Sequence, residues 1–268
     1  MVKNLKNKKT QQPIQLSQDI LYFPGHANIV VLNLGSKSLM IDCGRNITEA
    51  TKIRSEAESL FKNKIEYVAL THFHGDHTHS LPLFSDCQII ASNQLVKFLK
   101  AAKRKPERNF PLVFPNVVFE EKYVIKESDS EIIIKQTGGH TPDSSYVYSP
   151  KHKLLATGDN IRSDFLWGGR HSDPDKWIFA LKEYVSFDIN YIIIGHGEIM
   201  KKEEVNLILE YVLEVKKMII DFLEKNKNEK EIILKGKEIK PRGEFEVFIH
   251  DDTIIKWYKF WKKKIRST

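Results

Sequence analysis

Cysteine is scarce in this sequence, with only Cys43 and Cys87 among 268 residues. Two cysteines cannot form the disulfide framework of a small secreted domain, so the composition favours a reducing compartment. No apolar run approaches the roughly 18 residues that a membrane-spanning helix needs. The basic segment 1–15 is not followed by the apolar stretch of a secretory signal. We therefore expect a soluble, cytoplasmic protein without a membrane partner.

An excess of negative charge is also missing, because 42 Lys and Arg residues outnumber 35 Asp and Glu residues and give a net charge of +7. A basic surface can attract nucleic acid, but a solvated lysine-rich surface explains the same charge, and we favour that interpretation. The expected partner is a small-molecule substrate, with nucleic acid as the less favoured alternative. The hydrophobic content of 41% is sufficient for a buried core. The oligomeric state is left open.

Short apolar runs separated by turn residues predict alternating strands and helices. Residues 1–18 are polar and predict a flexible N-terminal tail, whereas residues 19–200 contain the strand-like runs of the main domain. Residues 201–268 predict a helical extension that packs on the same domain, beginning with a long amphipathic helix over 202–224. An apolar stripe at helical spacing follows near the end, formed by Ile254, Trp257, Tyr258, Trp261 and Ile265.

Histidine is concentrated in one segment, THFHGDHTHS at residues 71–80. A predicted apolar strand leads directly into this segment. His72 and His74 are two residues apart, so in extended backbone their imidazoles point the same way and can reach one metal ion. Asp76 and His77 follow a glycine, where a turn can redirect the chain toward a second ion. One short loop can therefore serve two metals.

Three further side chains of the metal-binding type follow predicted strands elsewhere in the chain. His140 lies in GGHTPDS, Asp159 lies in TGDN, and His196 lies in GHGE, each next to a glycine. Loops at strand ends collect into functional sites on α/β scaffolds. Any one of these residues alone would be an ordinary turn residue. Their repetition, with imidazole and carboxylate chemistry mixed, predicts that they complete the site begun by residues 71–80.

The ordered segments THFHGDH, GGHTPDS, TGDN and GHGE, with IDCG upstream, resemble the metallo-β-lactamase superfamily of metallohydrolases over roughly residues 20–200. This resemblance implies an α/β fold, a four-layer αββα sandwich with the metals at one edge of its two sheets. Residues 19–200 would form the catalytic domain, and the helices after residue 200 would be additional to it.

The resemblance also implies a role for each candidate residue. Asp159 would bridge two metal ions, Asp76 would bind one ion and act as the catalytic residue that orients the hydroxide, and Asp42 would support the ligands from outside. Imidazole and carboxylate ligands favour zinc, with iron or manganese as alternatives. The implied ligands are His72, His74 and His140 for the first metal, Asp76, His77 and His196 for the second, and Asp159 for both.

The expected activity is hydrolysis by a hydroxide that bridges two divalent ions. Within the superfamily, GGHTPDS is similar to glyoxalase II-like esterases and thioesterases, and Asp159 stands where the commonest zinc β-lactamases carry cysteine. The sequence therefore favours the glyoxalase II and lactonase-like branch, with a carboxylic ester, thioester or lactone as substrate. The alternatives are a phosphodiesterase or ribonuclease of the same fold, a β-lactamase-like activity and, as a minor alternative, a non-catalytic metal-binding protein.

Several other polar and aromatic residues lie near these motifs without an assigned role. His79 lies outside the ligand pattern and is expected on the following helix, at the surface or behind the ligands. The resemblance implies that the loop FPGHAN, residues 23–28, borders the metals. Four residues after the bridging aspartate are candidates for substrate contacts, namely Phe165, Trp167, Arg170 and His171. The substrate-binding residues remain undetermined at this point.

Overall fold

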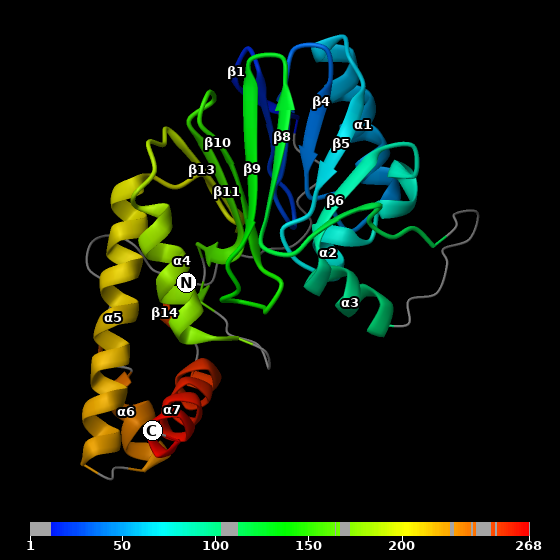
Figure 1. The fold of residues 1–268 in the computed structure, drawn as a ribbon. Coiled ribbons are helices and arrows are strands. Elements are labelled where there is room, and N and C mark those ends of the chain that lie inside the picture. The colour runs from blue at the N-terminus through cyan, green and yellow to red at the C-terminus, as the bar shows by residue number, and fades with distance from the viewer. Residues whose placement is uncertain are drawn as a thin grey trace.

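Two mixed β-sheets face each other, and helices cover the outer face of each sheet, as Figure 1 shows. The computed structural model describes residues 12–102, 112–163, 165–166, 172–225, 228–236, 238–239, 248–249 and 251–267. The four-layer αββα sandwich expected from the sequence is therefore confirmed.

The first sheet has seven strands in sequence order, antiparallel from β1 to β4 and parallel from β4 to β7. Its parallel half needs crossovers, which run through α1 (Ile47–Phe61), through α2 (Gly75–Thr78) with η1 (Leu81–Phe84), and through α3 (Asn93–Ala101). Apolar side chains of α1, η1 and α3 pack on the outer face of the sheet. The strands are β1 (Ile14–Ser17), β2 (Ile20–Phe23), β3 (Ile29–Asn33), β4 (Ser38–Ile41), β5 (Ile65–Ala69), β6 (Gln88–Ser92) and β7 (Val117–Phe119).

The second sheet has five strands in the order β13-β11-β10-β9-β8, of which only β11 and β13 pair in parallel. A short parallel pair lies apart from it, β12 (Phe165–Leu166) with β14 (Phe248–Ile249). The strands of the second sheet are β8 (Lys122–Glu127), β9 (Ser130–Gln136), β10 (Ser145–Ser149), β11 (Leu154–Arg162) and β13 (Tyr191–His196).

Polar residues at the helix starts explain where two of the helices begin. The Asn46 side chain accepts hydrogen bonds from the backbone of Thr48 and Glu49, and Asp173 does the same for the helix that starts with Pro174. The helices are α1 (Ile47–Phe61), α2 (Gly75–Thr78), the 3-10 helix η1 (Leu81–Phe84), α3 (Asn93–Ala101), α4 (Pro174–Tyr184), α5 (Lys202–Glu224), α6 (Glu229–Gly236) and α7 (Asp251–Arg266).

Three apolar layers hold the sandwich together. In β2, Ile20 and Tyr22 point between the two sheets, whereas Leu21 and Phe23 point toward α1 and α3. Because successive strand residues face opposite sides, a strand covered on both faces is apolar throughout. A third layer packs the outer face of the second sheet against α4, α5 and α7, with Trp177 and Trp257 fully buried. The C-terminal helices therefore share a hydrophobic core with the second sheet.

The described chain differs from the sequence-based expectation at its N-terminal end. Residues 14–17, which the sequence analysis placed in a polar tail, form edge strand β1 and pair with β2. All four β1 side chains are exposed or half-buried, so this strand lacks the apolar alternation by which strands are recognised. The amphipathic helix predicted over 202–224 is present as α5.

Candidate functional site

The predicted residues lie together at one edge of the sandwich, mostly at or just after strand ends. Asp159 is the exception, because it was expected after a strand but lies inside one. His72 and His74 follow β5, and His140 lies in the loop between β9 and β10. Asp159 lies within β11 and His196 is the last residue of β13. Asp76 and His77 belong to the single-turn helix α2 that follows directly. All seven sequence-predicted residues are therefore gathered in one place from segments far apart in the chain.

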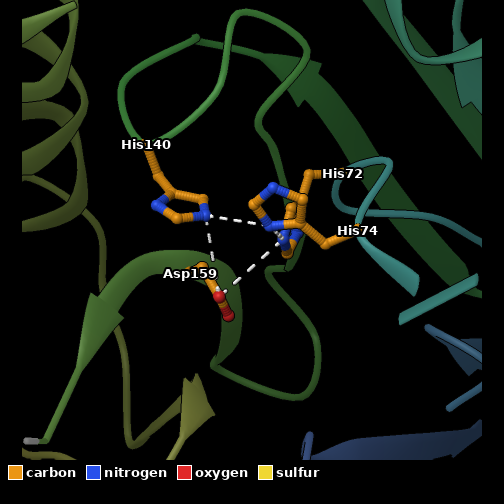
Figure 2. Close-up of side chains that lie close together, drawn as sticks. All are labelled: His72, His74, His140 and Asp159. Carbon is orange, nitrogen blue, oxygen red and sulfur yellow. Dashed lines mark hydrogen bonds and ion pairs between the residues drawn. The ribbon is translucent and has the colours of Figure 1, made fainter. Parts of the chain in front are cut away.

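Three imidazoles and one carboxylate oxygen form the first donor set (Figure 2). His74 Nδ1 lies 3.0 Å from His72 Nε2 and 3.2 Å from His140 Nε2. Asp159 Oδ2 lies 3.8 Å from His72 Nε2 and 3.7 Å from His140 Nε2. The side chains of His72, His140 and Asp159 are almost completely buried, so the four donor atoms are aimed at a common point away from bulk water.

The other oxygen of Asp159 faces a second donor set. Asp159 Oδ1 lies 3.2 Å from His77 Nε2 and 3.2 Å from His196 Nε2. Asp76 Oδ2 lies on the solvent side of this set, 3.3 Å from His196 Nε2 and 3.9 Å from His77 Nε2. One carboxylate thus separates two clusters of donors and contributes one oxygen to each.

Hydrogen bonds on the outer ring nitrogens orient the imidazoles. His77 Nδ1 lies 2.7 Å from Asp42 Oδ2, and the same carboxylate accepts hydrogen bonds from the backbone and hydroxyl of Thr71. His196 Nδ1 donates to the backbone carbonyl of His26. A proton held on Nδ1 leaves Nε2 as a lone-pair donor that points into the site. Asp42 therefore has the supporting position that the sequence resemblance implied.

Two glycines allow the strands to approach closely enough. Gly158 has a φ of +52°, and a Cβ there would lie 2.6 Å from Thr71 Oγ1. A Cβ at Gly195 would lie 1.9 Å from Asp159 Oδ1. Gly158 therefore requires glycine because of its positive φ and because a Cβ would clash with Thr71. Gly195 requires glycine because a Cβ would clash with Asp159. The close approach of neighbouring atoms thus explains why glycine stands next to Asp159 and His196.

The electrostatics of the first donor set suit cation binding at neutral pH. Burial lowers the pKa of His72, and it lowers the pKa of His74 to about 4, with a further contribution from His140. Burial would raise the pKa of Asp159, but His77 and His72 hold that pKa well below its usual range. The first donor set therefore consists of neutral imidazoles and an ionised carboxylate, which are the forms that coordinate metal.

Unsatisfied buried atoms show that these residues fit metal ions. His77 Nε2, His196 Nε2 and Asp159 Oδ1 are buried and have no well-oriented hydrogen-bond partner among the described residues. Orphaned polar atoms of this kind are costly in a folded protein unless something else binds them. Imidazole and carboxylate donors arranged in this way suit zinc and similar divalent ions.

One residue near the second donor set was not predicted as a site residue. His26, in the loop between β2 and β3, has its Nε2 atom 3.5 Å from Asp76 Oδ2, and it forms a third group of possible metal donors with Asp76 and His196. The sequence did carry a signal, because His26 follows a glycine as His140 does. The apolar run 20–23 also precedes His26 as 131–137 precedes His140, but the loop was interpreted only as a border of the metals.

Among the remaining candidates, those that the structure describes take no part in the donor sets. His79 is exposed and its ring packs against Gly75, as expected for a histidine outside the ligand pattern. Phe165 lies in β12. Trp167, Arg170 and His171 lie outside the described residues. None of the described helices combines the length and apolar character needed to cross a membrane.

Comparison with known sequences places this geometry in a family. The model of the metallo-beta-lactamase superfamily matches residues 22–196. Beta-lactamase-like protein 2 homolog from Caenorhabditis elegans is 23% identical over 203 residues, which cover 74% of this chain and 66% of that protein. An atrochrysone carboxyl ACP thioesterase from Aspergillus novofumigatus is 24% identical, covering 65% of this chain and 49% of that protein. The chain thus spans about half to two thirds of the length of these relatives.

Solved structures show the same fold. The sec-alkylsulfatase Pisa1 from a Pseudomonas species matches with a TM-score of 0.75 at 15% identity, covering 92% of this chain and 49% of that chain. Residues 1–200 make up less than 92% of this chain. The match must therefore include part of the segment after residue 200, which contains α5 to α7. The family model covers well over half of this chain, and the chain has the fold expected for that model. The chain therefore belongs to the metallo-beta-lactamase superfamily.

Proposed function

We propose that this chain is a dinuclear metal-dependent hydrolase of the glyoxalase II and lactonase-like branch, acting on a carboxylic ester, thioester or lactone. The observation that carries the proposal is the position of Asp159, whose two oxygens face separate donor sets. The curated relative named as an acyl carrier protein thioesterase supports an acyl substrate. So does GGHTPDS, which resembles the corresponding segment of glyoxalase II-like esterases.

The two donor sets define how the metals would be held. Zinc is the proposed metal, because the donors are imidazoles and carboxylates. Two divalent cations in these sets would lower the pKa of a water molecule and polarise the carbonyl oxygen of the substrate. The proposed ligands of the first cation are His72, His74, His140 and Asp159 Oδ2, and those of the second are Asp76, His77, His196 and Asp159 Oδ1.

Asp76 is the proposed catalytic residue. Its side chain is 22% exposed, compared with 3% for Asp159, so Asp76 is the carboxylate that an incoming substrate and water can reach. Burial would raise the pKa of Asp76, but the adjacent imidazoles of His196 and His77 hold that pKa below its usual range. An ionised Asp76 therefore accepts a hydrogen bond from the attacking water and orients its lone pair toward the carbonyl carbon.

The test is a substrate panel on protein of measured metal content. We expect protein loaded with two equivalents of zinc to hydrolyse thioesters, carboxylic esters or lactones faster than β-lactams or phosphodiesters. A preference for a β-lactam or a phosphodiester would assign the chain to another branch. Absence of turnover on every substrate class, with both metals bound, would contradict the proposal.

Asp159→Ala tests the bridging role directly. Because both donor sets lose an oxygen, we expect metal content and hydrolysis to fall together. Asp129→Ala is the matched control, because Asp129 lies in the exposed turn between β8 and β9 and pairs with Lys151. An Asp159→Ala protein that keeps two metals and full activity would rule out the assignment.

A further inference from the structure

The loop between β2 and β3 carries a histidine to the solvent side of the second donor set. His26 Nε2 lies 3.5 Å from Asp76 Oδ2, and the His26 ring stands edge-on to the ring of His196, with the centroids 5.5 Å apart. One donor atom from each of His26, Asp76 and His196 lies within 4.8 Å of the others. The His26 side chain is 62% exposed, so no packing requirement explains why it is directed at this carboxylate.

The loop is fastened to the strand that delivers His196. Asn28 Nδ2 donates to the carbonyls of Ile194 and Gly197, both at 2.8 Å, and the backbone N–H of Asn28 donates to the Gly195 carbonyl at 2.9 Å. The hydroxyl of Tyr22 reinforces this connection by donating to Asn28 Oδ1 or to the Gly197 carbonyl, each 3.0 Å away. Loop and strand end therefore form one hydrogen-bonded unit, and the position of His26 is set relative to His196.

The backbone and side chain of His26 act on the same site. Its carbonyl accepts the hydrogen bond from His196 Nδ1, which turns His196 Nε2 inward. That Nε2 atom is buried without a well-oriented hydrogen-bond partner among the described residues. The side chain of His26 then presents its own Nε2 to Asp76, on the face of the second set that is open to solvent. Donors from three segments of the chain thus surround one position.

We infer that His26 Nε2 is an additional ligand of the second divalent cation, together with Asp76, His77, Asp159 and His196. The inference rests on the two-cation site of the proposed function and adds one imidazole to it. An exposed imidazole on the solvent side is accessible to a cation entering from water. The resulting set of three imidazoles and two carboxylates suits zinc or cobalt better than calcium or magnesium, which prefer oxygen ligands.

The test compares His26→Ala and His26→Gln with the unaltered chain. Both variants keep the backbone carbonyl that orients His196, so they remove only the side-chain ligand. The matched control is His79→Gln, which changes an exposed histidine two residues after His77 that belongs to none of the described donor sets. Each protein is freed of metal with a chelator, checked for cooperative thermal unfolding, and titrated with zinc and with cobalt(II).

We expect both His26 variants to bind the second equivalent of zinc at least about tenfold more weakly, with the first equivalent unchanged, since even the loss of an outer supporting residue weakens metal binding about 10- to 100-fold. The visible spectrum of the second cobalt equivalent should change in both variants. X-ray absorption at the zinc edge should report one imidazole fewer per two zinc ions. The His79→Gln protein should match the unaltered chain in all three measurements.

Two outcomes would overturn the inference. One is binding of the second equivalent by both His26 variants with unchanged affinity and cobalt spectrum. The other is an unchanged imidazole count at the zinc edge, which would mean that His26 acts only through its contact with Asp76. Neither measurement involves a substrate, so a failure here is distinguishable from a failure of the proposed hydrolase activity, which the substrate panel tests separately.

Discussion

The backbone of Gly195 lies directly against the carboxylate of Asp159, so closely that a Cβ at Gly195 would lie 1.9 Å from Asp159 Oδ1. That oxygen is the one that faces His77 and His196. The parallel pairing of β11 and β13 brings the two residues together. The position of the shared carboxylate therefore depends on a neighbouring residue that has no side chain.

Gly195→Ala is expected to push Asp159 out of place. We expect metal content to fall at both sites and the free energy of unfolding to drop by about 1–3 kcal/mol, as for other overpacked core positions. Elemental analysis and thermal unfolding measure the two effects. Gly236→Ala is the control, because its Cβ would meet atoms of the flexible Ile254 and Met218 side chains, away from the site. Normal metal content in Gly195→Ala would show that the carboxylate can be held in another way.

Asp42→Asn is expected to weaken the second metal site selectively. Asp42 Oδ2 lies 2.7 Å from His77 Nδ1, and an amide placed there can present an N–H that forces His77 to carry its proton on Nε2. We expect the second equivalent of zinc to bind about 10- to 100-fold more weakly while the first is retained, as measured by titration of metal-free protein. Asp188→Asn, at an exposed aspartate paired with Lys153, should leave both equivalents unchanged. Equal weakening at both sites would argue against a selective role for Asp42.

Asp143→Asn is expected to change how stability depends on pH. Burial raises the pKa of Asp143 to about 6, above the value of about 3.9 expected in the unfolded chain. The folded protein therefore binds the proton more tightly, and ionisation of Asp143 costs stability as the pH rises from about 4 to 6. The amide that replaces this carboxyl cannot ionise, so the variant should gain stability relative to the unaltered chain over this range, up to about 3 kcal/mol.

The measurement for this variant is denaturant unfolding of metal-free protein between about pH 4 and 8, the range that contains the ionisation. Chelator is present throughout, so that metal release at low pH does not contribute. Asp129→Asn, at an exposed aspartate beside Lys151, is the control and should show no such gain. A stability difference between the Asp143→Asn and unaltered proteins that does not vary with pH would contradict the prediction.

Asp175→Ala is expected to loosen the C-terminal helix without affecting the metal site. The Asp175 carboxylate accepts hydrogen bonds from Lys216 of α5 and from Trp261 and Lys264 of α7. Burial opposes the shift, but the bonds from Lys216 and Lys264 hold the pKa of Asp175 at about 2. The stabilisation is therefore present above about pH 4 and is lost as the pH falls toward about 2.

We expect Asp175→Ala to lower the free energy of unfolding by about 1–3 kcal/mol at neutral pH, because it removes hydrogen bonds from charged groups. Amide hydrogen exchange in α7 should speed up relative to α1, with metal content unchanged. Asp188→Ala removes an exposed carboxylate and serves as the control. Unchanged exchange in α7 would mean that the packing of Trp257 alone holds the helix.

The sequence predicted much of the site because a predicted apolar strand leads into residues 71–80, and the three ligands outside this segment each adjoin a glycine after a predicted apolar run. Strand ends meet at one edge of a sheet, so His140, Asp159 and His196 could be grouped with residues 71–80 from their positions in the sequence. Helix α5 was equally predictable, because its apolar periodicity extends over 23 residues. Strand β1 was not, because a half-exposed edge strand has too few buried side chains to show a pattern.

The sequence by itself therefore determined the residue types, their order along the chain and the apolar runs that form the two sheets. Tertiary structure set the distances by which each oxygen of Asp159 faces a different donor set and Asp42 orients His77, as the family resemblance implied, and it alone decided that His26 reaches Asp76. These relationships depend on distances between atoms of residues that are tens of positions apart in the chain. Local propensity and periodicity carry no information about such distances, because they are set by the packing of whole sheets against each other.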